Sequence, residues 1–232
     1  MNAPQSAPLF AIPCWNCHAP ASAAAFCPSC GKIQPLPNGA DYFTFFGLPR
    51  KLWLDMDGLE QKFLQLSWKL HPDIFVNLTE REKEISLERS SKLNDAYRVL
   101  RDPVARVEYL LELEGMRKEG EHKQQAPPEL LEEVFELNES LDELREARSA
   151  GANLDALAGR LRAAEKNFGE KLHEVDAELQ TAAQQWDAAL DADASEADRE
   201  AILQRLNELL NRRSYIRNLV AGVDKELTGA AT

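Results

Sequence analysis

Apolar residues in the second half of this 232-residue chain recur at alternating steps of three and four positions. This spacing places them along one side of an α-helix, and it continues through three blocks separated by short polar breaks. Long amphipathic helices joined by short connections pack against one another as a bundle. We therefore predict an all-α fold whose C-terminal part, residues 129–232, is an antiparallel three-helix bundle. The stripe of its first helix consists of Leu130, Val134, Leu137, Leu141 and Leu144.

Shorter amphipathic segments precede the bundle. We expect a short apolar helix at 42–47 and a longer helix that starts near Asp57, a residue suited to the N-cap. The longer helix should end at the tripeptide His71-Pro72-Asp73, because proline lacks an N–H group and clashes with the preceding turn. A polar corner is therefore expected at the end of an amphipathic helix.

A second start signal follows this corner. Thr79, with Glu82 three positions later, matches the capping box that begins a helix. The apolar face of that helix ends at Asp102, and Pro103 suits the first position of a further short helix. Residues 115–128 show no apolar periodicity, so they are predicted to be a linker.

The two helices and the loop between them carry a recognisable combination of motifs. A loop with His-Pro-Asp, followed by the run LNDAYRVLRDP on the second helix, resembles the J-domain of DnaJ-type co-chaperones. The resemblance implies a helical hairpin, the J-domain, within residues 41–114. It also implies that His71, Pro72 and Asp73 contact a DnaK-type ATPase chaperone and stimulate its ATP hydrolysis. Basic residues on the preceding helix usually support this contact, and those that the helix offers here are Lys62 and Lys69.

All four cysteines lie in residues 1–40, in the pattern C-x2-C-x9-C-x2-C. Two such hooks can give four thiolates to one tetrahedral ion, and Gly31 fits the tight turn after the second hook. The segment holds seven of the twelve prolines and no Asp or Glu, so metal binding would have to supply its folding energy. A closed four-thiolate site indicates structural zinc, with iron and a pair of disulfides as alternatives, and His18 is expected to be a bystander. The predicted ligands are Cys14, Cys17, Cys27 and Cys30.

Charge and hydropathy restrict the partners. The formal net charge is -12, which suits basic partner surfaces and disfavours contact with nucleic-acid phosphates. No apolar run approaches the roughly 20 residues of a membrane helix. The first residues have neither the basic start of a secretory signal nor the Arg-rich character of a transit peptide. We expect a cytoplasmic protein, or a mitochondrial one if the source is eukaryotic, without nucleic-acid or membrane partners.

The first bundle helix has a second feature besides its apolar stripe. Glutamates cluster on the side opposite the stripe, and two large apolar residues, Leu131 and Phe135, fall between the two faces. A solvated helix face would explain the glutamates alone. Apolar anchors beside charges suit a docking surface better, because the anchors supply affinity and the charges steer the partner. The clustered glutamates are Glu132, Glu136, Glu139 and Glu143.

A J-domain followed by an acidic three-helix module resembles the HscB family of iron–sulfur cluster co-chaperones. The runs ELNESLDEL and VEYLLEL are the specific matches, and the likeness covers roughly residues 41–227. The four-cysteine segment at 1–40 is similar to a segment of the eukaryotic relatives. The resemblance implies that the bundle binds an IscU-type cluster scaffold protein. The residues that it assigns to scaffold binding are Leu131, Phe135, Glu136, Glu139, Glu143 and Tyr215.

The predicted protein is an adaptor and not an enzyme. It would deliver the scaffold to a DnaK-type, HscA-like ATPase chaperone and so promote cluster transfer and the maturation of iron–sulfur proteins. Two alternatives remain at this stage. One is a J-protein for another client, and the other is a redox or iron-handling protein in which the thiolate site is the active part.

Overall fold

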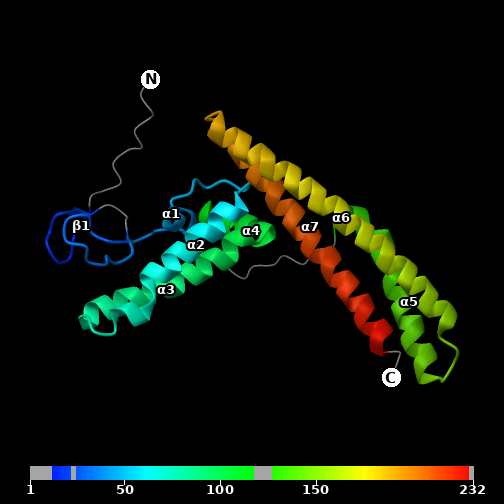
Figure 1. Ribbon diagram of the computed structural model, residues 1–232. Coiled ribbons are helices and arrows are strands. Elements are labelled where there is room, and N and C mark those ends of the chain that lie inside the picture. Colours follow the sequence, from blue (N-terminus) through cyan, green and yellow to red (C-terminus); the bar gives the residue numbers. More distant parts are fainter. Residues whose placement is uncertain (1–11, 22–24, 118–126, 230–232) are drawn as a thin grey trace. The chain divides into compact units, whose positions relative to one another are not determined.

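The computed structural model of the chain describes residues 12–21, 25–117 and 127–229. The chain divides into two compact units, Met1–Tyr109 and Leu110–Thr232 (Figure 1). The division falls inside helix α4 (Pro103–Leu113). The domain boundaries that the sequence suggests therefore remain predictions, and most of the predicted linker lies outside the described residues.

The first unit begins with a small ribbon. Strand β1 (Ile12–Pro13) pairs antiparallel with β2 (Pro20–Ala21), with Ile12 opposite Ala21. Helix α1 (Tyr42–Phe46) follows, and its N-cap residue Asp41 accepts a hydrogen bond from the Thr44 N–H at 2.7 Å. Regular structure in the described residues is otherwise helical, apart from an isolated bridge, so the predicted all-α class is confirmed.

Two longer helices form a hairpin in the first unit. Helix α2 (Met56–Leu70) and helix α3 (Glu80–Arg101) lie side by side, joined through the 3-10 turn η1 (Pro72–Phe75) (Figure 1). The predicted start of α2 is wrong by two residues, because Asp55 takes the N-cap position. Asp57 lies instead in the first turn, where a carboxylate favours the positive end of the helix dipole.

Apolar contacts and caps hold this hairpin. The rings of Phe63 and Tyr97 stack with centroids 4.1 Å apart, and they continue a core formed by Leu59, Leu70 and Leu93. Both contacts of the predicted capping box at the start of α3 are present. The predicted proline start of α4 is also confirmed.

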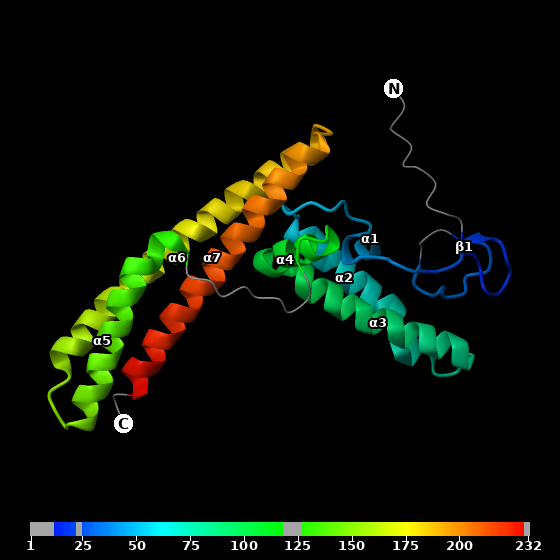
Figure 2. The ribbon, with the colours of Figure 1, turned by 180° about the vertical axis from the view of Figure 1, so that it is seen from behind.

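The second unit consists of three helices after the short 3-10 turn η2 (Pro128–Leu130). They are α5 (Leu131–Ser149), α6 (Asp155–Asp191) and α7 (Glu196–Gly229), and α6 and α7 run along each other for most of their length (Figure 2). The predicted start signal of α7 is present, because the Asp198 N–H donates to Ser195 Oγ at 3.2 Å.

Ion pairs between neighbouring helices show the relative direction of the three helices. Between α5 and α6, Glu133 pairs with Lys171 and Glu143 pairs with Arg160, so residue numbers run in opposite directions. Between α6 and α7, Asp176 pairs with Arg213 and Glu178 with Arg205, which again indicates antiparallel helices. The side chains that fill the core include Val134, Leu137, Leu144, Leu161, Phe168, Val175, Leu206 and Ile216.

No helix in the described part of the chain combines the length and apolar character that crossing a membrane requires.

Candidate functional site

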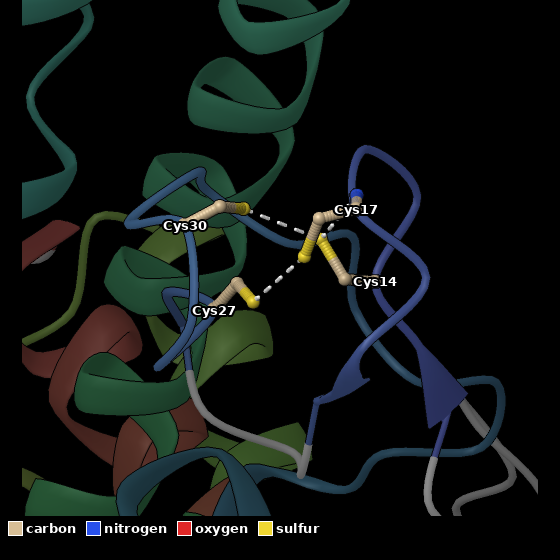
Figure 3. Close-up of side chains that lie close together, drawn as sticks. All are labelled: Cys14, Cys17, Cys27 and Cys30. Carbon is tan, nitrogen blue, oxygen red and sulfur yellow. Dashed lines mark hydrogen bonds between the residues drawn. The ribbon is translucent and has the colours of Figure 1, made fainter.

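The four cysteines converge on one point in the first unit (Figure 3). All four Sγ atoms lie within 4.8 Å of one another. The Sγ atoms of Cys14 and Cys30 are 3.6 Å apart, and those of Cys17 and Cys27 are 3.8 Å apart. Zinc–sulfur bonds of about 2.3 Å in a tetrahedron place the sulfurs roughly 3.8 Å apart, so the set fits a four-thiolate metal ion. The disulfide alternative is wrong, because all four thiols are free and the sulfurs are too far apart for a bond of about 2.05 Å.

Each hook is a tight turn with the same backbone geometry. The His18 N–H donates to the Cys14 carbonyl at 2.9 Å, and the Gly31 N–H donates to the Cys27 carbonyl at 2.9 Å. Both donors have a positive φ, 58° at His18 and 71° at Gly31. Gly31 fits this turn as predicted. His18 lies outside the sulfur cluster but has a backbone role that its side-chain chemistry did not indicate.

Backbone donors prepare the sulfur of Cys14 for a metal. Burial opposes the charged thiolate, but the N–H groups of Cys17 and Asn16 point at Sγ from 3.5 Å and 3.4 Å and lower the pKa of the thiol to about 6. The side-chain amide of Gln34 adds a further contact at 3.3 Å. Donors of this kind stabilise a metal-bound thiolate, because metals take up deprotonated sulfur.

The His-Pro-Asp corner is presented to solvent. The His71 side chain is 55% exposed and that of Asp73 is 85% exposed. The Asp73 N–H donates to His71 Nδ1 at 3.3 Å, and Nδ1 lies 3.5 Å from Asp73 Oδ2, so the imidazole closes its own turn. A hollow of about 490 Å³ lies beside the corner, and its lining includes His71, Pro72, Ser67 and Leu87. The corner can therefore be reached by another molecule.

The corner rests on hydroxyl groups from α3. The carbonyl of Leu70, the last residue of α2, accepts hydrogen bonds from Ser86 Oγ and Ser90 Oγ, each at 2.8 Å. A helix leaves its last carbonyl groups without partners, and here one of them is satisfied from the neighbouring helix. Both predicted basic residues, Lys62 and Lys69, are exposed, and Lys62 also donates to the Phe46 carbonyl at 3.4 Å.

The predicted scaffold surface lies on α5. Leu131 is 54% exposed and Phe135 is 69% exposed, so neither contributes fully to the bundle core. Leu131, Phe135 and Glu139 follow one another at steps of four, which aligns them along the helix. Glu136 is also exposed, and both Glu136 and Glu139 line a groove of about 460 Å³ next to α6.

Two further predicted residues differ from this group. Glu143 forms an ion pair with Arg160 of α6, so its charge is already partly compensated. Tyr215 is half-buried on α7. Arg212 of α7 reaches Glu129 at 3.5 Å, which sets Tyr215, one turn later, near the level of the first turn of α5.

Sequence patterns did not indicate a group of contacts between the cysteine segment and α3. Lys32 pairs with Glu82 at 2.9 Å, and Arg89 donates to backbone carbonyls of the segment. Glu82 and Arg89 are buried charges on a helix, and a buried charge requires a partner. That requirement is a signal, but it does not say where in the chain the partner lies.

Comparison with known proteins adds relatives over most of the chain, although no family model matches it. The chain is 38% identical over 136 residues to the iron-sulfur cluster co-chaperone protein HscB homolog of Arabidopsis thaliana, a match that covers 59% of the chain and 53% of that relative. It is 34% identical over 151 residues to the co-chaperone protein HscB homolog of Vibrio vulnificus, covering 65% of the chain and 85% of that relative. The mouse iron-sulfur cluster co-chaperone protein HscB is 32% identical over 164 residues, covering 69% of the chain and 68% of the mouse protein.

The fold agrees with these relatives. The crystal structure of the human co-chaperone protein HscB matches with a TM-score of 0.62 and 26% identity, over 92% of this chain and 97% of the human one. The sequence relatives and the matching fold thus point to the same family as the J-type hairpin and the acidic bundle do. The chain belongs to the HscB family of co-chaperones.

Proposed function

We propose that the chain is a co-chaperone of iron–sulfur cluster biogenesis that delivers a cluster scaffold to an ATPase chaperone. The observation that carries this proposal is the exposed His71-Pro72-Asp73 corner between two packed helices. The names of the Arabidopsis and mouse relatives support the link to iron–sulfur clusters. The chain is not itself an enzyme, because a co-chaperone acts through the activity of another protein.

The J-type hairpin is the part that meets the chaperone. His71 and Asp73 extend into solvent from a corner whose backbone is fixed by Ser86 and Ser90. A DnaK-type, HscA-like partner would dock on this corner, with Lys69 adding favourable charge. ATP hydrolysis then takes place on the partner, so His71 serves as a contact and not as a general base.

The bundle is the part that holds the client. Leu131 and Phe135 offer exposed apolar area, and Glu136 and Glu139 stand beside them. This combination suits an IscU-type scaffold with an apolar patch bordered by basic residues. Holding both proteins on one chain raises the effective concentration of the scaffold at the chaperone without any new chemistry.

The cysteine site supports the fold of the first unit. Cys14, Cys17, Cys27 and Cys30 would hold zinc, which would cross-link a segment whose buried apolar cluster is formed by its own cysteines and Ala21. Four thiolates leave no open coordination position, which argues against a catalytic metal that binds a substrate. The cytoplasmic location expected from the sequence stays a prediction.

Substitution of the corner tests the proposal. His71→Gln should keep scaffold affinity unchanged and abolish stimulation of the chaperone's steady-state ATPase, because only the exposed imidazole is altered. Lys166→Gln, an exposed change in the other unit, is the matched control and should stimulate like the unmodified chain. Equal stimulation by His71→Gln would remove the J-domain function.

Metal analysis and co-purification separate the two alternatives. A colourless protein with one zinc per chain contradicts an iron-handling role, since four-thiolate iron absorbs visible light. Recovery of a chaperone but no scaffold on affinity purification would instead favour a J-protein that serves another client.

A further inference from the structure

The cysteine segment is attached to the start of α3, the same turns that support the His-Pro-Asp corner. Lys32 follows Gly31 at the end of the second hook, and its Nζ lies 2.9 Å from Glu82 Oε1. The Glu82 side chain is only 3% exposed, and Glu82 is the residue that closes the capping box of α3. The ammonium group of Lys32 holds the pKa of the Glu82 carboxyl below its ordinary value.

The two oxygens of Glu82 serve different parts of the fold. Oε1 accepts from Lys32 of the cysteine segment, whereas Oε2 accepts from Thr79 Oγ1 at 2.8 Å and from the Thr79 N–H at 3.3 Å. Thr79 is the residue at which the loop after His71-Pro72-Asp73 enters α3. One carboxylate therefore joins the cysteine segment to the exit of that loop.

Two more contacts strengthen the attachment. Arg89, two turns into α3 and buried, donates through Nε to the Gln34 carbonyl and through Nη2 to the Pro35 carbonyl, the latter at 3.1 Å. The amide of Gln34 reaches Cys14 Sγ at 3.3 Å, so a single residue links a ligand sulfur to α3. Arg89 is only 3% exposed, and this burial lowers the pKa of its guanidinium to about 10.

Trp15, which lies between the first two cysteines, completes the contact. Its indole N–H donates to the Ile33 carbonyl at 2.6 Å, and the guanidinium of Arg81 lies 4.6 Å from its ring centroid. Arg81 is in the first turn of α3. The indole thus connects both hooks of the segment to the beginning of the helix.

These contacts depend on the metal for a physical reason. The buried apolar cluster of the segment consists of Cys14, Cys27 and Ala21, with Cys30 beside it, so the ligands themselves are most of its core. A segment of this kind is ordered by its ion. If the segment loses order, Glu82 and Arg89 lose partners that they require as buried charges, and the first turns of α3 must open to let water reach them.

We propose that the metal-loaded cysteine segment is a brace for the His71-Pro72-Asp73 loop, with Lys32 and Trp15 as its positioning residues. The inference rests on the proposed chaperone function for its consequence in ATP hydrolysis, but the brace itself is a statement about the order of α3. Loss of the metal leaves the side chains of the corner unchanged. It removes the contact of Lys32 with Glu82, the residue that holds the end of the loop at Thr79.

Hydrogen exchange on the full chain tests the brace directly. Lys32→Met removes the ammonium group and keeps all four cysteines, so metal content should stay the same. Amide exchange in residues 72–89 should become about tenfold faster, since a lost hydrogen bond to a charged group is of that order. Lys83→Met is the matched control, because Lys83 is on the same turn of α3 as Glu82 but pairs with Glu80 at the surface. Equal exchange in the two variants would overturn the brace.

Chaperone stimulation gives the second readout. Lys32→Met should raise about tenfold the concentration of the chain that gives half-maximal stimulation of ATP hydrolysis. Scaffold affinity should stay unchanged. Lys32→Arg keeps the positive charge and should stimulate like the unmodified chain. Removal of the metal with a chelator should produce the same faster exchange in 72–89. Unchanged exchange after verified metal loss would contradict the brace. If the unmodified chain fails to stimulate, the proposed function fails while the exchange result still decides the brace.

Discussion

At the scale of single residues, hydroxyl groups decide how the His-Pro-Asp corner is held. Ser86 is fully buried and Ser90 half-buried, and both donate to the same carbonyl of Leu70. That carbonyl is followed directly by His71, so its hydrogen bonds set where the corner leaves α2. A buried carbonyl without a partner is destabilising, which gives these serines a measurable role.

Serine substitutions test this role. Ser86→Ala should lower the free energy of unfolding of the first unit by about 1 kcal/mol, and Ser86→Ala with Ser90→Ala should lower it by about 2–3 kcal/mol, because the carbonyl then loses both donors. Urea unfolding measures both values. Ser91→Ala, an exposed change on the same helix, is the control and should stay within about 0.5 kcal/mol. A double variant as stable as the control would contradict the role.

At the scale of elements, α5 combines packing and recognition on one helix. Its buried residues Val134, Leu137 and Leu144 face the bundle, while Leu131 and Phe135 remain in solvent. A large apolar residue that the core does not need is available to a partner. Replacing it therefore affects binding with little effect on the bundle.

Replacing both anchors tests the α5 surface. Leu131→Ala and Phe135→Ala should each weaken scaffold binding by about 1–3 kcal/mol, because each removes exposed apolar area at the centre of the proposed interface. Titration calorimetry measures the affinity, and circular dichroism should show unchanged helicity. Leu64→Ala removes a leucine of similar exposure on α2 and should leave scaffold affinity unchanged. Unchanged affinity in these variants would show that Leu131 and Phe135 do not contribute to scaffold binding.

The glutamates of α5 should differ in how much they contribute to the rate of scaffold association. Glu139 lines the groove and forms no ion pair with any described residue, whereas Glu143 is paired with Arg160. Glu139→Gln should slow scaffold association roughly threefold at low salt, since an exposed charge contributes about 0.2–1 kcal/mol. Glu143→Gln should change the rate less. Stopped-flow association at two salt concentrations separates the two, and a larger effect at Glu143 would contradict the assignment.

The sequence predicted elements better than contacts between them. Three-four spacing and the capping box at Thr79 located the helices, because both signals are local. The start of α2 was missed because Asp55 and Asp57 are both suitable near a helix start. The partners of Glu82 and Arg89 could not be predicted, since their contacts join segments far apart in the chain. The spacing of the cysteines did predict their convergence, because so few arrangements of two short hooks are possible.

At the scale of the whole molecule, the chain consists of two compact units, to which we assign different tasks. The first unit combines the cysteine segment with the J-type hairpin, and the second is a helical bundle with its own ion pairs. The proposed adaptor role requires each unit to keep its binding surface when the other unit is perturbed. Metal removal should therefore act on the first unit alone.

Hydrogen exchange can locate that effect. After chelation, amides of α5, α6 and α7 should exchange at their original rates, because no described residue of the bundle belongs to the cysteine cluster. Scaffold affinity should also be unchanged. Faster exchange throughout the bundle would show that the two units share their stability.

The salt bridge from Lys32 to Glu82 joins residues 50 positions apart, and the Arg89 contact to Gln34 joins residues 55 apart. During synthesis, the four cysteines are made before Glu82 and Arg89, the two residues of α3 that hold the segment. Domains fold as they emerge, starting from the N-terminus. We therefore expect the newly synthesised segment to bind its metal ion first and to pack onto α3 once that helix has formed.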